Sequence, residues 1–347
     1  MPVLQANNLN DLILSTLKDL GELKFTAIIS DLQKHVAMRE LIKKNRIVLD
    51  SGTAIQWQLM IGTSNAAKWT GMYAQDNVDV REVMTQASMP WRHSTTNYGV
   101  DQREIDMNRE PRRIVELIKV RRIDAMTAMA ELLENAFWGV PGPMDDRTPH
   151  GVPYWIVKNN VEGFFGGAPT GFTDVGGVSP TTYTRWRNWT SQYAAVTKAD
   201  LVRKLRQAYT KTNFTPPTEG IPTYSTGRKY GMYTNYEVIS KLEEILEGQN
   251  DDLGNDVASQ DGLVHFRKIP VEYVPRLDAD TTNPIYGIDW GNFKTYVLRG
   301  WWLKETRIGN VANQHTVSTV HIDNTLNWVC KDRRSNFVLA TDVGLPA

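Results

Sequence analysis

The side chains best suited to bind a metal ion are two histidines six residues apart. His315 and His321 lie in the alternating run HTVSTVH, which predicts a strand with both rings on one face. A zinc site needs at least three side-chain ligands, and no third ligand lies close in the sequence. We therefore interpret the pair as two hydrophilic strand positions, and we expect no metal site.

Three aspartates in one polar segment, Asp251, Asp252 and Asp256, are the residues that could suggest a calcium site. They lack the spacing of an EF-hand loop and its closing glutamate, so we interpret the segment as a solvated loop. Cys330 is the single cysteine, which excludes an intramolecular disulfide and a cysteine-based zinc site. It lies in the apparent strand NWVCKD, where we expect a buried packing residue rather than a nucleophile.

The common catalytic and nucleotide-binding motifs do not occur in this sequence. GVPGP and GGAPTG contain glycines, but proline interrupts both and neither leads into a helix, so we expect no phosphate-binding loop. The neighbouring carboxylates Asp145 and Asp146 leave open a glycan-active hydrolase that uses surface tryptophans for stacking. Adjacent residues tend to point apart, which is poor geometry for a paired acid and base. No catalytic residue and no cofactor are expected.

Charge and hydropathy exclude several further classes of protein. The 347 residues include 39 basic and 39 acidic side chains, so the whole molecule has no electrostatic reason to bind a polyanion. Hydrophobic residues make up 41%, enough for a substantial core. No apolar run approaches the roughly 20 residues that span a bilayer, and the N-terminus lacks a secretory signal. We expect a soluble protein made in a reducing compartment or released by lysis, with no membrane partner.

The strongest helix prediction is one long helix over residues 111–138. Pro111 suits its first turn, apolar residues recur at three- and four-residue steps, and Gly139 followed by Pro141 ends it. At 1.5 Å per residue this helix would be about 40 Å long, so we interpret it as a strut. Its first half is basic and includes Arg112, Arg113, Arg121 and Arg122. These arginines form either a solvated face or a face turned toward a polyanion, with phosphate contacts that do not read the base sequence.

The remaining segments predict a polar arm, a β excursion, a mixed middle and a β-rich tail. Short helices are expected over 11–20 and 29–44, and sparsely apolar alternation over 47–108 suits an extended hairpin that needs a partner. Residues 140–197 are rich in glycine, proline and aromatics, with one strand expected at 153–157. Further expected elements are helices at 198–211 and 235–248, a strand at 230–233, and strands through most of the last eighty residues. Large aromatics in loop-like segments must pack on the chain's own core or on a neighbouring subunit.

In this order the segments resemble the major capsid protein of tailed bacteriophages, an α+β protein with the Hong Kong 97-type fold. The runs that carry the resemblance are GVPYWIVKNN, GFFGGAPTGF, YTRWRNWTSQYAAVTKADLVRKLRQAY, GRKYGMYTNYEVISKLEEI and the tail FRKIPVEYVPRLD with NPIYGIDWGNFKTYVLRGWWLKE. The resemblance covers essentially the whole chain, and its motifs are architectural, with no catalytic signature among them.

The resemblance implies five parts of the chain. They are an N-terminal arm at 1–48, an extended loop at 49–108, a peripheral domain with the spine helix at 109–149, an axial domain at 150–260, and C-terminal strands at 261–347 that complete the peripheral and axial domains. Trp57, Trp69 and Trp91 would then pack across an interface between subunits. Arg112, Arg113, Arg121 and Arg122 would face the lumen and packaged DNA. Lys68 invites the idea of a covalent cross-link, but no local motif supports one.

The function implied is assembly into an icosahedral head shell that encloses the double-stranded DNA of a tailed phage. The partners implied are the chain itself in pentamers and hexamers, portal and scaffolding proteins, non-specifically bound DNA, and a decoration protein in some relatives. Because the sequence begins at Met1, a separate scaffolding protein is expected. The chain would be made in the bacterial cytoplasm and would function in the virion. An encapsulin-like compartment, which shares the fold and encloses enzymes, remains the alternative within this class.

Overall fold

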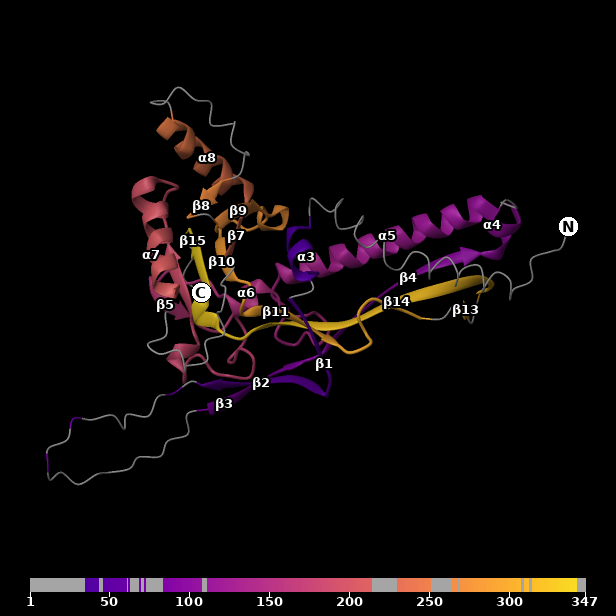
Figure 1. The fold of residues 1–347 in the computed structure, drawn as a ribbon, viewed down its shortest axis with the longest axis horizontal. Coiled ribbons are helices and arrows are strands. Elements are labelled where there is room, and N and C mark those ends of the chain that lie inside the picture. Colours follow the sequence, from indigo (N-terminus) through magenta and orange to yellow (C-terminus); the bar gives the residue numbers. More distant parts are fainter. Residues whose placement is uncertain are drawn as a thin grey trace.

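A computed structural model gives the arrangement of the chain, which is elongated (Figure 1). It describes residues 35–43, 46–60, 62, 69, 72, 84–107, 111–213, 230–250, 264–267, 269–306, 309–311 and 314–341. At residues 105, 111–117, 246–250, 309–311 and 314–315 the description covers the backbone alone. The expected helix at 11–20, the acidic loop at 251–256 and Lys68 lie outside the described residues.

The first sheet is built around one long strand. β14 (Gln314–Cys330) pairs antiparallel with β4 (Arg92–Asp101) on one side and with β11 (Phe293–Leu298) on the other. Three shorter strands complete this sheet, with β1 parallel to β11 and the other two antiparallel to β14: β1 (Ile47–Asp50), β12 (Lys304–Glu305) and β13 (Gly309–Val311). A short helix, α4 (Gln102–Met107), follows β4.

The long helix α5 (Pro111–Phe137) lies along the β4–β14 pair, and together they form one elongated end of the molecule (Figure 1). One stripe of the helix buries apolar side chains against the strands: Ile118, Ala125 and Met126 pack with Tyr98, Val100, Val320 and Ile322. A helix covers an antiparallel sheet in this way because each hides the other's apolar face from water. The strut predicted at 111–138 is therefore confirmed to within one residue.

The second sheet has seven strands in the order β5-β6-β15-β10-β7-β9-β8. Their bounds are β5 (Gly163–Gly166), β6 (Asn188–Gln192), β15 (Phe337–Ala340), β10 (Ile285–Asp289), β7 (Tyr230–Thr234), β9 (Ile269–Tyr273) and β8 (His265–Phe266). Two helices pack on it, α7 (Arg203–Thr212) and α8 (Tyr236–Asn250), and a π-helical turn at Lys198–Val202 precedes α7. Single 3₁₀ turns occupy Thr184–Trp186, Pro275–Leu277 and Arg333–Ser335.

Both faces of this second sheet are buried, because alternate residues of its central strands enter two different cores. Phe337 and Leu339 of β15 face the core under α7 and α8, whereas Val338 between them faces the central aromatic core. The same alternation separates Met232 from Tyr233 on β7. A strand covered on both faces reads as a continuous apolar run, which is why FVLA shows no polar alternation.

A two-stranded hairpin projects from the opposite side of the molecule (Figure 1). It consists of β2 (Ala54–Met60) and β3 (Met84–Pro90), paired in register from Ala54 with Pro90 to Met60 with Met84. Alternate residues face inward and are buried: Ile55, Trp57, Leu59, Ala87 and Met89. The base of the hairpin is thus held by the chain's own core. The sequence pattern had instead indicated a hairpin that needs a partner to be stable.

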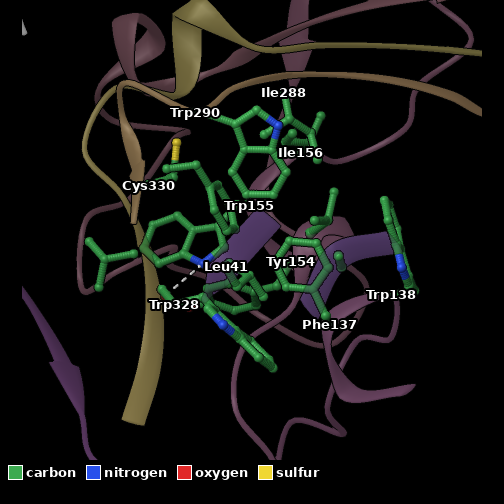
Figure 2. Close-up of a cluster of buried hydrophobic side chains, with 14 of the residues drawn as sticks. Leu41, Phe137, Trp138, Tyr154, Trp155, Ile156, Ile288, Trp290, Trp328 and Cys330 are labelled. Atoms are coloured by element: carbon green, nitrogen blue, oxygen red, sulfur yellow. Dashed lines mark hydrogen bonds between the residues drawn. The ribbon is translucent and has the colours of Figure 1, made fainter. Parts of the chain in front are cut away.

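An aromatic core joins the helix, the hairpin and the two sheets (Figure 2). Phe137 at the end of α5 meets Trp328 of β14 and Phe293 of β11 edge to face, with ring centroids 5.1 and 5.6 Å apart. Trp155 donates a hydrogen bond from its indole N–H to the Trp328 carbonyl oxygen at 3.1 Å. Trp57 of the hairpin lies 6.2 Å from the Trp155 ring. These contacts make the separate elements one packed body.

Most sequence predictions of helices are confirmed, and two strand predictions are wrong. The predicted helices at 198–211 and 235–248 and the strand at 230–233 correspond to α7 with its preceding turn, α8 and β7. Residues 153–157 form no strand, because Val152–Trp155 is a short helix, α6, with proline in its first turn. Residues 92–101 do not belong to the hairpin, because β4 pairs with β14, more than two hundred residues away.

Of the helix predicted at 29–44, the described part is α3 (Val36–Leu41). It packs into the aromatic core through Val36, Met38 and Leu41. β1 follows it and pairs with β11 of the same chain. The segment from residue 35 onward is therefore part of the chain's own fold, and an arm that reaches other subunits must end before it.

Among the described helices, none is both long enough and apolar enough to cross a bilayer.

Candidate assembly surfaces

The three tryptophans predicted to pack between subunits lie in three different environments. Trp57 is only 9% exposed and packs beside Trp155 in its own chain, so it contributes almost no surface to a neighbour. The alternation of β2 turns it inward together with Ile55 and Leu59. Its role is to hold the base of the hairpin, which corrects the expectation that it lies in an interface.

Trp91 is partly buried at the start of β4. Its indole N–H donates a hydrogen bond to the carbonyl oxygen of Gly52 at 2.9 Å, which ties β4 to the turn before the hairpin. Trp69 is fully exposed, with no protein atoms covering its ring. Of the three, Trp69 alone presents its whole aromatic surface to solvent, where an indole ring gains most from burial by a partner.

The outward face of the hairpin carries exposed apolar side chains. Met60 and Met84, opposite each other at the outer end of the paired strands, are 71% and 53% exposed. Between the two strands in sequence, Met72 is 93% exposed. Closer to the base this face is polar, and the Gln86 side-chain amide donates to the Gln56 amide oxygen at 3.0 Å. Solvent-exposed methionines and a tryptophan on one projection are typical of a surface that is covered by another protein.

Two of the four arginines predicted to face DNA form ion pairs with glutamates of the same chain. Arg121 donates to the Gly99 carbonyl oxygen at 2.6 Å and pairs with Glu104 of α4 at 2.7 Å. Arg122 pairs with Glu305 of β12 at 2.5 Å, and both side chains are largely buried. These guanidinium groups brace α5 against the first sheet instead of pointing to a polyanion. The side chains of Arg112 and Arg113 lie outside the described residues, so their expected direction stays a prediction.

The metal and nucleophile candidates show no reactive arrangement among the described residues. His321 is exposed on β14, and the described side chains contain no group of three metal-ligating residues. Cys330 is fully buried, as predicted, and burial raises the pKa of its thiol well above the ordinary value. A thiol held neutral in this way is a poor nucleophile.

The carboxylate pair considered for glycan hydrolysis belongs to an exposed turn. A hydrogen bond from the Thr148 side chain lowers the pKa of Asp145, and hydrogen bonds from the backbone N–H groups of Arg147 at 2.8 Å and Thr148 at 3.3 Å lower it further. A cavity of about 250 Å³ lies beside this turn, between α5 and β4, and neither Asp145 nor Asp146 lines it. A general acid needs a raised pKa and a place in the cleft, so Asp145 does not have the properties of one.

Glu134, which was not predicted from the sequence, anchors one helix to another. Glu134 of α5 is fully buried, and its carboxylate accepts hydrogen bonds from the backbone N–H groups of Ala37 and Met38 at 3.1 and 2.9 Å. Trp138 donates to it as well, at 2.9 Å. Burial raises the pKa of this carboxyl. Glu134 thus fixes the start of α3, and it could have been found only as a glutamate on the apolar side of the helix pattern.

The fold is that of known capsid proteins, although the sequence identity to those compared below is low. No family model matches the chain, and no curated protein sequence matches it. The capsid protein of cyanophage A-1(L) superposes with a TM-score of 0.56 at 15% identity, over 85% of this chain and 90% of that one. The capsid of the native GTA particle gives 0.57 at 12% identity, over 89% and 91%. The capsid of the empty GTA particle gives 0.54 at 13% identity, over 85% and 93%.

This chain has the Hong Kong 97-type capsid fold. The resemblance seen in the sequence is confirmed at the level of the fold, and it extends over nearly the whole of the capsid chains compared.

Proposed function

We propose that this protein is the major capsid protein of a tailed phage and assembles into an icosahedral head shell around double-stranded DNA. The fold supports the proposal, and the observation that carries it is the projecting hairpin. Its base is fixed by five inward side chains, while Met60 at the end of β2 and Trp69 and Met72 beyond it are strongly exposed. A rigidly held projection with an uncovered apolar end is suited to lie on a second copy.

The parts of the chain take the following roles in this proposal. α5 is the spine helix, the sheet around β14 is the peripheral sheet, and the seven-stranded sheet with α7 and α8 is the axial sheet. The β2–β3 hairpin is the base of the extended loop. The extended loop comprises the hairpin up to Pro90, because β4 belongs to the peripheral sheet. The arm comprises residues before 35, because α3 and β1 belong to the chain's own fold. The axial domain comprises residues of 150–260 together with β9, β10 and β15, which the C-terminal part contributes. Copies meet in pentamers and hexamers through heterologous contacts that close on themselves.

The physical properties of the chain suit a shell made of many copies. Equal numbers of basic and acidic residues minimise repulsion between copies that lie side by side. In this proposal the other partners are portal and scaffolding proteins, a decoration protein, and DNA bound without sequence preference. The protein then functions in the virion after synthesis in the host cytoplasm.

The direct test is negative-stain electron microscopy of the purified full-length protein, with the hairpin end removed in a variant. Met60 and Met84 face each other, so a two-residue Asn-Gly turn can replace residues 61–83 without disturbing the paired strands. We expect closed shells from the wild type and a folded, unassembled chain from the variant. A larger deletion of 50–100 would also remove Trp57 and most of β4, and would unfold the chain rather than test assembly.

Two single substitutions control for general effects of removing apolar surface. Trp69→Gln should reduce shell yield, whereas Met144→Gln, at an equally exposed apolar residue on another surface, should not. Shells formed at full yield by the shortened hairpin would refute the role given to it. Absence of shells from the wild type would refute the function itself. Nucleic acid inside the particles agrees with a phage head, and enclosed protein would indicate an encapsulin-like compartment instead.

A further inference from the structure

The outer surface of helix α7 is strongly basic. Its sequence RKLRQAYTKT contains no acidic residue. Leu205, Ala208 and Thr212 are buried against the axial sheet, so Arg203 and Arg206 lie on the opposite, exposed side. Among the described residues neither of these two arginines forms an ion pair. The helix therefore presents unneutralised positive charge to solvent.

The outer surface of helix α8 has the opposite charge. Its sequence YEVISKLEEILEGQN contains several glutamates and a single lysine, Lys241, which pairs with Glu237 at 2.9 Å. Val238 and Leu242 are buried, which leaves Glu243 and Glu244 exposed. Within the described part of the chain these two glutamates have no cationic partner. This helix presents unneutralised negative charge.

These two charged helices lie toward opposite ends of one sheet. α7 contacts β6 and β15, near the end formed by β5, while α8 contacts β9, beside β8 at the other end. Both helices bury their apolar sides in the same core, so they cover the same face of the sheet. The axial domain therefore has a basic surface toward one end of its sheet and an acidic surface toward the other.

We propose that the basic α7 surface of one copy docks on the acidic α8 surface of the next copy around the symmetry axis of a capsomer. The inference rests on the proposed function and specifies the contact that builds its rings. Two complementary surfaces at opposite ends of one domain make a heterologous contact between copies. Such contacts generate a closed ring when the rotation from one copy to the next is a whole fraction of a full turn. Opposite charge across the contact fixes which sides meet and repels a reversed neighbour.

A hollow beside α8 adds aromatic rings and the carboxylate of Asp278 to the acidic surface. The hollow has a volume of about 560 Å³ and is lined by Tyr236, Glu237, Tyr273, Asp278, Asp280 and neighbouring residues; Glu237 pairs with Lys241 and Asp280 with Lys158. Tyr236 and Tyr273 meet edge to face at 6.0 Å, and both are exposed. Asp278 accepts hydrogen bonds from the Tyr273 hydroxyl and the Tyr236 backbone N–H. Exposed tyrosine rings beside a carboxylate suit a guanidinium group, which can stack on the rings and pair with the carboxylate.

Charge reversal on each helix tests the contact in the full-length protein. The variants are Arg203→Glu with Arg206→Glu on α7, and Glu243→Lys with Glu244→Lys on α8. All four residues are exposed, so the fold should persist, as circular dichroism would verify. We expect each reversed protein to need about tenfold or more higher concentration to form capsomers, measured by native mass spectrometry, because like charges then meet. The conservative pairs Arg203→Lys with Arg206→Lys and Glu243→Asp with Glu244→Asp keep the charges and should assemble as the wild type does.

Combining the reversals separates a specific contact from general damage. A chain with both helices reversed restores opposite charges at every contact and should regain capsomers. In an equal mixture of the α7-reversed and α8-reversed proteins, each protein should bind only the other kind, so the two alternate around a ring. A ring of six allows strict alternation, whereas a ring of five must contain one contact between two copies of the same kind, where like charges meet. Pentamers should therefore be lost from the mixture while hexamers return.

Three further outcomes would decide between this contact, another role for the basic surface, and failure of the proposed function. Normal capsomer formation by both reversed proteins would overturn the inference while leaving the shell function intact. Intact shells from the α7 variant with less packaged nucleic acid would also overturn it, because the basic surface would then face a polyanion. Charge-dependent rings that never close into shells would support the contact and refute the proposed function.

Discussion

At the residue scale, the least expected feature is a fully buried arginine without a carboxylate partner. Arg333 donates to the backbone carbonyl oxygens of Trp155, Trp186 and Gly167, each at 2.7 Å. Burial lowers its pKa to about 10, so the guanidinium remains charged at neutral pH. Several carbonyl dipoles replace the water that the charge has lost, and they fasten the glycine- and aromatic-rich segment of 155–188 to the C-terminal strands.

A second buried residue, His150, predicts a specific dependence of stability on pH. Burial lowers its pKa from 6.5 to about 4, with Arg92 adding to the effect and the Asn327 side chain opposing it. The unfolded chain therefore takes up a proton at higher pH than the folded chain does. Stability from this group is complete above pH 6.5 and falls as the pH drops from 6.5 toward 4, by a few kcal/mol at most.

We expect His150→Gln to flatten this decline in the free energy of unfolding between pH 6.5 and 4. Urea denaturation of the unassembled chain at several pH values measures it. His321→Gln, at an exposed position, is the matched control and should leave the wild-type slope unchanged. A slope that does not change in His150→Gln would show that other groups cause the acid sensitivity.

At the element scale, α5 is held in place by both apolar packing and ion pairs. Ile118, Ala125 and Met126 pack on the β14 sheet, and Arg121 and Arg122 pair with carboxylates on α4 and β12. The Arg122 pair links elements that are close in space and distant in sequence, since Glu305 lies 183 residues from Arg122. Part of the basic residue pattern of α5 therefore serves to hold the helix in place.

Arg122→Gln should lower the free energy of unfolding by about 1–3 kcal/mol, because it leaves the largely buried Glu305 without its partner. Hydrogen exchange should quicken in the middle of α5 and in β12. Arg147→Gln is the matched control: its pair with Asp146 spans 4.0 Å between exposed side chains, and no measurable change is expected. Equal effects of both substitutions would contradict the bracing role.

At the scale of the whole molecule, one aromatic core contacts the β14 sheet, the seven-stranded sheet and the hairpin, so we expect them to unfold together. Phe137 is central to this core, with Trp138, Phe293 and Trp328 edge to face and Trp290 stacked at 6.1 Å (Figure 2). Most tryptophans pack inside the chain: Trp57, Trp138, Trp155, Trp186, Trp189, Trp290 and Trp328 are buried.

Phe137→Ala should therefore destabilise the chain by about 3–5 kcal/mol, because it opens a cavity where the elements meet. Hydrogen exchange should lose protection in β11 and β14 and also in β7 and β10. Phe165→Ala, at a residue 44% exposed, should cost less than about 1 kcal/mol. Loss of protection confined to one sheet would show that the two sheets are separate folding units.

Local sequence patterns predicted the helices well and the strand partners poorly. The 3.6-residue spacing in α5, α7 and α8 indicates which side of each helix is apolar. The alternation of 92–101 equally well suits a hairpin strand and a sheet strand. Its pairing with β14 is a contact between residues more than two hundred apart, and nothing in the local pattern encodes it.

By itself, the sequence determined the neutral charge, the long strut, the buried cysteine and the resemblance to capsid proteins. Only the tertiary structure decided that Trp57 packs inward, that Arg121 and Arg122 are paired, and that the basic and acidic helices lie toward opposite ends of one sheet. The physical reason is that periodicity reveals which side of an element avoids water. The partner that covers that side is chosen by long-range packing of the whole chain.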